Sequence, residues 1–194
     1  MRSNNKFCVP KLYIALLIIS LGIPLSGYAQ KVALKTNLLY DIATTLNAGV
    51  EFGLSPQWSL EVPFNFNPWS FPDNKQVKHW LVQPELRYWF CDRFEGHFLG
   101  LHLHTGQYNV SGIDVFGLHP DFRYEGMLYG AGISYGYQWI LNNRWSIEAT
   151  LGVGYTLFDY AKHKCLDCAP KEGDFKKNYF GPTRFGLSII YYIQ

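Results

Sequence analysis

The sequence predicts an all-β fold: an eight-stranded antiparallel up-and-down transmembrane β-barrel with a polar, filled lumen. Three observations predict this class. Eight segments alternate apolar and polar residues with a period of two. The connections between them are alternately short and long, and aromatic residues gather near both ends of the apolar faces. Aromatic residues make up 18% of the chain beside 18 Gly, which favours large side chains outside and small ones inside a narrow barrel.

The N-terminus predicts export. Residues 1–29 begin with a segment that carries three cations and no acid, followed by a short apolar run and then small residues at Gly27 and Ala29. This pattern is typical of a secretory signal peptide cleaved between Ala29 and Gln30. An apolar run of about twelve residues is too short for a membrane anchor. We therefore expect a signal peptide over residues 1–29 and one barrel domain over residues 30–194.

The charge balance excludes one class of partner. Removal of residues 1–29 takes away three of the 17 Lys and Arg, which leaves 14 cations against 15 Asp and Glu. The exported chain is therefore almost neutral. Because no basic stripe is left, we expect no nucleic-acid partner.

Each strand is predicted from its alternation and from the turn residues beside it. The predicted strands are 32–40, 45–54, 58–67, 77–90, 98–108, 125–141, 145–157 and 179–193. No segment has a helical period. The turns after the second, fourth and sixth strands are short, whereas the loops near 68–76, 107–124 and 159–178 are long. Short periplasmic turns and long external loops are typical of outer-membrane barrels, with both termini in the periplasm.

The segment 58–67, WSLEVPFNFN, raises the question of which strand face points into the barrel. Its Trp, Leu, Val and Phe residues share one face, and Ser59, Glu61, Asn65 and Asn67 lie on the other. In a soluble barrel of the lipocalin kind, the aromatic face would line a ligand cavity. Eight strands leave too little interior room for all these rings. We therefore expect the aromatic face to contact lipid.

Pro63 interrupts the same segment. Proline cannot donate a ladder hydrogen bond, and a closed barrel has no free edge. We expect a bulge or a missing bond there, facing the partner strand near Leu81.

Charged residues recur on the predicted lumen faces. They are Lys35, Glu51, Glu61, Glu85, Arg87, Glu148 and Arg184. A narrow interior must pair such charges, because an isolated buried charge is costly. We expect a salt-bridge network that closes the barrel to solutes. A catalytic pair of carboxylates is the alternative, but no substrate cleft is evident.

Two further pairs of residues are candidate sites. His102 and His104 share a lumen face and could supply two metal ligands, but no third ligand is identifiable, so we expect a hydrogen-bonded pair and no metal or cofactor. Cys165 and Cys168 form a single CxxC in the last long loop, where an oxidising compartment favours a local disulfide over zinc. Cys91 is a separate thiol in a predicted periplasmic turn.

Several blocks of the sequence resemble a known family. They are KTNLLYD (35–41), NAGVEFGL (47–54), WSLEV (58–62), NPW (67–69), KHWLVQPELRYWF (78–90) and GHFLGLHLHTGQYN (96–109). Together they resemble domain-of-unknown-function family 3575, secreted proteins mostly of Bacteroidetes. The resemblance implies an outer-membrane β-barrel, often encoded near surface-adhesin systems, without established activity. Residues 184–191 also resemble the C-terminal signal read by the barrel-assembly machinery.

We therefore expect an integral outer-membrane protein with a non-catalytic role in envelope structure or surface interaction. The expected partners are outer-membrane lipid, the barrel-assembly machinery during insertion and a surface or adhesin protein. One alternative is a lipid-modifying enzyme that uses Ser70, His79, His119 or His163 near the outer loops, although no motif connects these residues. The other alternative is a small pore.

Overall fold

The structure, a computed structural model, describes residues 32–70, 75–112, 122–163 and 171–193. The predicted signal peptide and the Cys165–Cys168 pair lie outside these residues. Within the described ranges, no helix is both long enough and apolar enough to cross a membrane.

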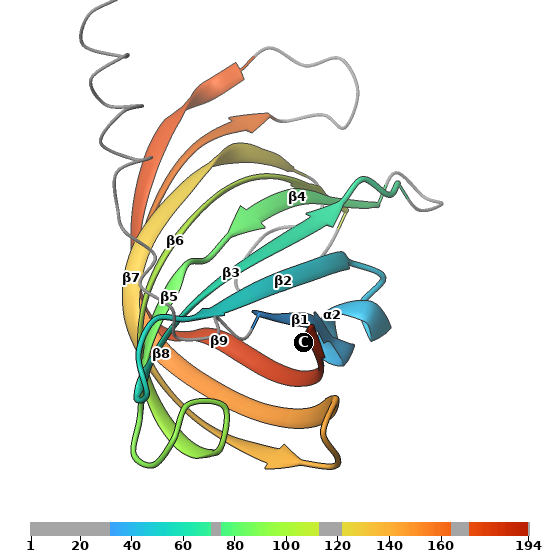
Figure 1. The fold of residues 1–194 in the computed structure, drawn as a ribbon. Helices are drawn as coiled ribbons and strands as arrows, with labels where there is room; N and C mark the ends of the chain where they lie inside the picture. The colour runs from blue at the N-terminus through green and yellow to red at the C-terminus, as the bar shows by residue number, and fades with distance from the viewer. Residues whose placement is uncertain (1–31, 71–74, 113–121, 164–170, 194) are drawn as a thin grey trace, which may run out of the picture.

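The described residues form nine strands and one short helix. They are β1 (Val32–Asn37), α2 (Leu38–Ile42), β2 (Leu46–Gly53), β3 (Trp58–Asn67), β4 (Gln76–Val82), β5 (Glu85–Trp89), β6 (Gly96–Ser111), β7 (Arg123–Ile140), β8 (Trp145–His163) and β9 (Lys171–Ile193). Neighbouring strands pair antiparallel, and β1 pairs with β9, which closes the ring in Figure 1. Since β4 and β5 occupy one position between β3 and β6, the ring has eight positions. The predicted all-β, eight-stranded antiparallel barrel is confirmed.

The two faces of the wall are divided as the alternation predicts. On β6, Leu101 and Leu103 are 58% and 60% exposed on the outer face, whereas His102 and His104 between and after them are buried. Most other strands follow the same pattern, although the residues of β4 are all half-buried. The buried residues of this barrel are mostly polar. The apolar side chains therefore lie outside the barrel.

The strand predicted over residues 77–90 is interrupted at Gln83 and Pro84. Phe64 pairs with Val82 before the break and Glu61 pairs with Glu85 after it, so the register is unchanged across the gap. Pro63 lies opposite Gln83 and accepts a hydrogen bond from its backbone N–H at 3.3 Å. Neither proline can donate in return.

The prediction of a missing bond at Pro63, facing the partner strand near Leu81, is thus confirmed. The residue opposite Pro63 is Gln83, while Leu81 itself pairs with Asn65. Sequence reasoning overlooked the break at Pro84, because the inward and outward parity of the strand continues across it.

The first strand is shorter than predicted, because residues 38–42 form the helix α2 instead of a continued strand. The side chain of Asn37 accepts a hydrogen bond from the backbone N–H of Leu39 at 3.1 Å, as an N-cap does. After the helix, Thr44 has a φ of 57°. The indole of Trp69 donates to the Thr44 carbonyl at 2.8 Å and so holds this turn.

The last two long strands extend well beyond the predicted ends. Their pairing continues to His163 and Lys171, so the expectation of a loop over residues 159–178 was wrong. Figure 1 shows the hairpin in orange and red projecting past the rest of the barrel. We call its paired segments, residues 158–163 and 171–177, the outer ribbon. Charged residues on both faces of the ribbon conceal the hydrophobic period.

A bulge occurs in β9 between the outer ribbon and the segment that pairs with β1. Gly152 pairs with Arg184, but the next residue, Val153, pairs with Pro182. Thr183 is the extra residue. Both Thr183 and Arg184 consequently contact lumen groups, His102 and Glu61 respectively.

The seam between β1 and β9 is short, and side chains complete it. Only residues 188–193 of β9 pair with β1. Above them, the Asn37 amide donates to the Phe185 carbonyl at 2.9 Å and accepts from the Leu187 N–H at 3.2 Å. The Gln83 amide donates to the Thr183 carbonyl at 3.1 Å. These two amides satisfy backbone groups that a longer β1 would otherwise bond.

Candidate functional site in the barrel lumen

The end of the lumen nearest the short turns is closed by a cluster of apolar side chains. The indole of Trp89 lies 4.8 Å from the ring of Phe98, and both side chains are completely buried. Phe94, from the turn between β5 and β6, packs on Tyr192 at 5.5 Å. Ala33 and Ile190 complete the cluster. We call it the aromatic floor.

Above the floor, the predicted charged residues form a network of ion pairs. Arg87 lies at its centre, with nitrogens 2.6 Å from Glu85, 2.8 Å from Glu148 and 3.1 Å from Glu51; it also contacts Glu61. All these side chains are buried. One guanidinium therefore joins four carboxylates, as its planar set of donors allows.

The two other cations connect the edges of this network. The Lys35 ammonium lies 2.5 Å from Glu51 and 2.6 Å from Glu148. The Arg184 guanidinium lies 2.7 Å from Glu61 and 3.3 Å from Glu85. The structure thus brings together all seven residues that the sequence marks as lumen charges.

The network reaches every position of the ring. The seven charged residues come from β1, β2, β3, β5, β8 and β9. On β7, Ser134 donates to Glu85 at 2.9 Å. On β6, the His102 Nδ1 atom lies 3.6 Å from the same carboxylate. Since each of the eight wall positions contributes, the network spans the cross-section of the lumen.

Neutral hydroxyls help to balance the acids, because four Glu face three Lys and Arg. Ser59 donates to Glu51 at 2.5 Å and also accepts from the Trp89 indole at 2.8 Å. Thr150 donates to Glu148 at 2.8 Å. Hydrogen bonds of this kind stabilise a buried carboxylate. Ser59 therefore links the ion network to the aromatic floor.

Glycines on the opposite wall make room for these side chains. A Cβ atom added at Gly100 would lie 2.6 Å from the carboxyl carbon of Glu85, and one at Gly132 would lie 2.6 Å from the His102 Nε2 atom. Both distances are too short for real contacts. These glycines on β6 and β7 thus leave the space that Glu85 and His102 occupy.

His102 and His104 lie in the lumen with rings 5.8 Å apart, and each bonds a threonine. The Nε2 atom of His102 lies 2.9 Å from the Thr183 hydroxyl, and that of His104 lies 2.8 Å from the Thr156 hydroxyl. In the described part of the chain, no group of three or more His, Cys, Asp or Glu residues could hold a metal ion.

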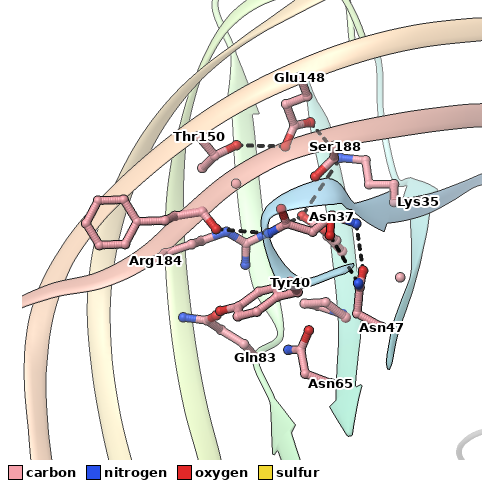
Figure 2. Close-up of a pocket in the computed structure, with 15 residues that line it drawn as sticks. Lys35, Asn37, Tyr40, Asn47, Asn65, Gln83, Glu148, Thr150, Arg184 and Ser188 are labelled. Atoms are coloured by element: carbon pink, nitrogen blue, oxygen red, sulfur yellow. Dashed lines mark hydrogen bonds and ion pairs between the residues drawn. The ribbon is translucent and has the colours of Figure 1, made fainter. Parts of the chain in front are cut away.

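A small cavity lies between the ion network and α2. Figure 2 shows Asn37, Tyr40, Gln83, Asn65 and Arg184 around it. Its volume is about 30 Å³, which is enough for a water molecule or two and too small for a substrate. The carboxylates of Glu61 and Glu148 that line it are already engaged in ion pairs.

Among the described residues considered for an outer-rim enzyme, His79 and His163 lie on strands that are not adjacent. His79 lies on β4 and His163 at the end of β8, with β6 and β7 between these strands. The His79 Nδ1 atom lies 3.2 Å from the Val77 carbonyl, and Ser70 forms an isolated bridge with Gln76. His119 lies outside the described residues.

A comparison with protein-family models identifies the family of the chain. A family model described as "Protein of unknown function (DUF3575)" matches residues 14–193. The chain belongs to this family. The family resemblance predicted from the N-terminal blocks is therefore confirmed, and the DUF3575 match extends over all nine strands. No curated protein and no solved structure matches the chain.

Sequence reasoning missed two features of this DUF3575 barrel, the aromatic floor and the side chains that complete the seam. Trp89 and Phe98 alternate with outward-facing residues of their strands, so their positions place them on the lumen face. That alternation could have predicted the aromatic floor. Asn37 and Gln83 complete the seam through contacts between residues 100 or more positions apart. No local pattern could have indicated those contacts.

Proposed function

We propose that this DUF3575 protein is an integral outer-membrane β-barrel that is closed to solutes and has a non-catalytic role, in envelope structure or in surface interaction. The observation that carries the proposal is the inverted distribution of side chains. Charged and polar residues fill the interior, while large apolar residues on all strands but β4 are exposed.

The outer surface supports the proposal of a lipid environment. Soluble monomers rarely expose contiguous apolar patches larger than a few hundred Å², yet here the exposed apolar residues encircle the barrel. On β8, the outward residues from Trp145 to Leu157 carry no charge, and Trp145, Leu151, Tyr155 and Leu157 are each 44–55% exposed. A height of about 25 Å is typical of the apolar band on such barrels.

Aromatic side chains lie near both ends of that surface. Trp58, Trp139 and Trp145 are exposed beside the short turns. Tyr155 and Trp69 are exposed toward the opposite end. Two aromatic girdles of this kind mark the two membrane interfaces of outer-membrane barrels.

The interior supports a closed barrel without catalysis. The aromatic floor and the ion network leave a cavity of only about 30 Å³ between the network and α2. Since the carboxylates of the network are held by cations or hydroxyls, none is placed to act on a substrate. Under this proposal the functional surface is the outer end of the barrel, and its partner is a surface protein.

The proposal includes delivery through the signal peptide over residues 1–29 and insertion by the barrel-assembly machinery. We expect the protein in the outer-membrane fraction, where an unboiled sample should migrate differently from a boiled one on an SDS gel. We also expect no conductance in planar bilayers. A protein that is recovered as soluble and shows no heat-dependent shift would contradict the membrane location, and steady conductance would contradict the closed lumen.

A further inference from the structure

The outer ribbon has an edge without a neighbouring strand. Beyond the seam, β9 pairs only with β8, and among the described residues no strand pairs with the other edge of residues 173–183. Pro182 in this stretch agrees with an edge, because proline in sheets is confined to edges and bulges. Such an edge presents free backbone N–H and C=O groups that can bond another strand.

The sequence along this edge is self-complementary. In an antiparallel pairing of two copies centred on Phe175, Asp174 of each copy lies opposite Lys176 of the other, and Gly173 lies opposite Lys177. No like charges face each other in this register. Lysines on an edge usually oppose pairing, but here each described lysine lies opposite an acid or a glycine.

Residues of β8 extend the charge complementarity, so that rows of oppositely charged side chains would cross the joined ribbons. Asp159 pairs with Lys176, whose ammonium lies 3.8 Å from the carboxylate. In the paired copies, Lys176 would lie between Asp159 of its own chain and Asp174 of the other. Opposite charges in cross-strand positions stabilise a sheet.

The central row is aromatic. Tyr160 pairs with Phe175 in the monomer, and their rings stack at 5.8 Å. Pairing of two copies about Phe175 would bring the two Phe175 rings together and give a row of four aromatic side chains. Phe175 is 42% exposed in the monomer, so this row would also bury apolar surface.

From this edge we infer that the protein forms a two-fold symmetric dimer in which residues 173–177 of two copies pair as antiparallel strands. The same contact is made twice, as a two-fold axis requires. The axis is normal to the ribbon and reverses the strand direction, so the two barrels lie at opposite ends of the joined ribbons. For barrels in a membrane this arrangement joins two facing membranes, a consequence that rests on the proposed function; the pairing itself does not.

A cysteine on the two-fold axis tests the pairing. We expect Phe175→Cys to form a disulfide-linked dimer under mild oxidation, in a background with Cys8, Cys91, Cys165 and Cys168 replaced by Ser, because residues directly opposite each other lie within disulfide reach. The control is Phe180→Cys, which is 78% exposed on the same strand but does not lie opposite its own copy in this register. Equal or faster linkage through position 180 would mean random collision and would overturn the inference.

Charge exchange tests the register in purified protein in detergent micelles. By sedimentation velocity we expect a concentration-dependent monomer–dimer equilibrium for the wild type. Lys176→Glu or Asp174→Lys alone should raise the dimer dissociation constant roughly tenfold or more, since two opposite-charge contacts become like-charge contacts. An equimolar mixture of the two variants should recover dimerisation.

The mixture of the two variants distinguishes pairing between copies from the binding of a different polypeptide. Recovery on mixing supports pairing between copies, because an edge that binds a different extended polypeptide would not respond to mixing. A wild type that stays monomeric at all concentrations, or single variants that dimerise like the wild type, would overturn the inference. Neither result would change the heat-dependent migration on an SDS gel that tests the membrane location.

Discussion

The replacement of Arg87 by methionine is the most informative perturbation of the lumen. The Arg87 guanidinium contacts Glu51, Glu61, Glu85 and Glu148, and no part of the side chain is exposed. Its removal leaves four carboxylates with only two cations. Loss of one member of a buried ion pair costs about 3–5 kcal/mol, so we expect Arg87→Met to lose at least that much of the free energy of unfolding.

Two further variants determine whether the loss comes from uncompensated charge. Arg87→Met combined with Glu148→Gln restores the original excess of one acid, so it should recover part of the lost stability. Lys75→Met removes an exposed cation outside the network and the outer ribbon and should change stability by less than about 1 kcal/mol. The assay is equilibrium unfolding in urea, followed by tryptophan fluorescence of the barrel folded in lipid vesicles. An Arg87→Met variant within 1 kcal/mol of the wild type would refute the description of the network as buried and coupled.

Three other substitutions test separate parts of the barrel in the same unfolding assay. Gly132→Ala should cost about 1–3 kcal/mol, because the new methyl group would lie 2.6 Å from the His102 Nε2 atom; a neutral effect would mean that the glycine wall does not accommodate the histidine. Gln83→Leu should cost about 1–3 kcal/mol by leaving the Thr183 carbonyl unpaired, and an unchanged midpoint would remove Gln83 from the seam. Leu151→Arg should cost about 2–4 kcal/mol in vesicles if that side chain lies near the middle of the bilayer, whereas no loss would argue that the outer face meets water.

Period-two alternation predicted the ring and its two faces, because side-chain direction in a strand follows directly from position. Glu51 and Glu85 could be placed inside from parity alone, but parity gives neither distances nor partners. The contacts of Arg87 with four different carboxylates depend on the register between strands. That register is set by the whole closed sheet.

The features that could not be predicted have different physical reasons. The helix α2 is only five residues long, too short to display a helical period, and Leu38 to Tyr40 also fit a strand. The ends of β8 and β9 carry Asp159, Lys162 and Lys176 on a two-sided polar ribbon, where backbone pairing rather than apolar burial forms the strands. Sequence reasoning detected Pro63 because it breaks an otherwise regular pattern.

The most direct test of the central claim is quenching of single-tryptophan variants by bromine-labelled phospholipid acyl chains. One variant keeps only Trp145, which is 44% exposed on the outer face, and the other keeps only Trp89, which is completely buried in the aromatic floor. A membrane barrel with an inverted distribution of side chains predicts strong quenching of Trp145 and little quenching of Trp89. Equal quenching of the two, or no quenching of Trp145, would contradict it.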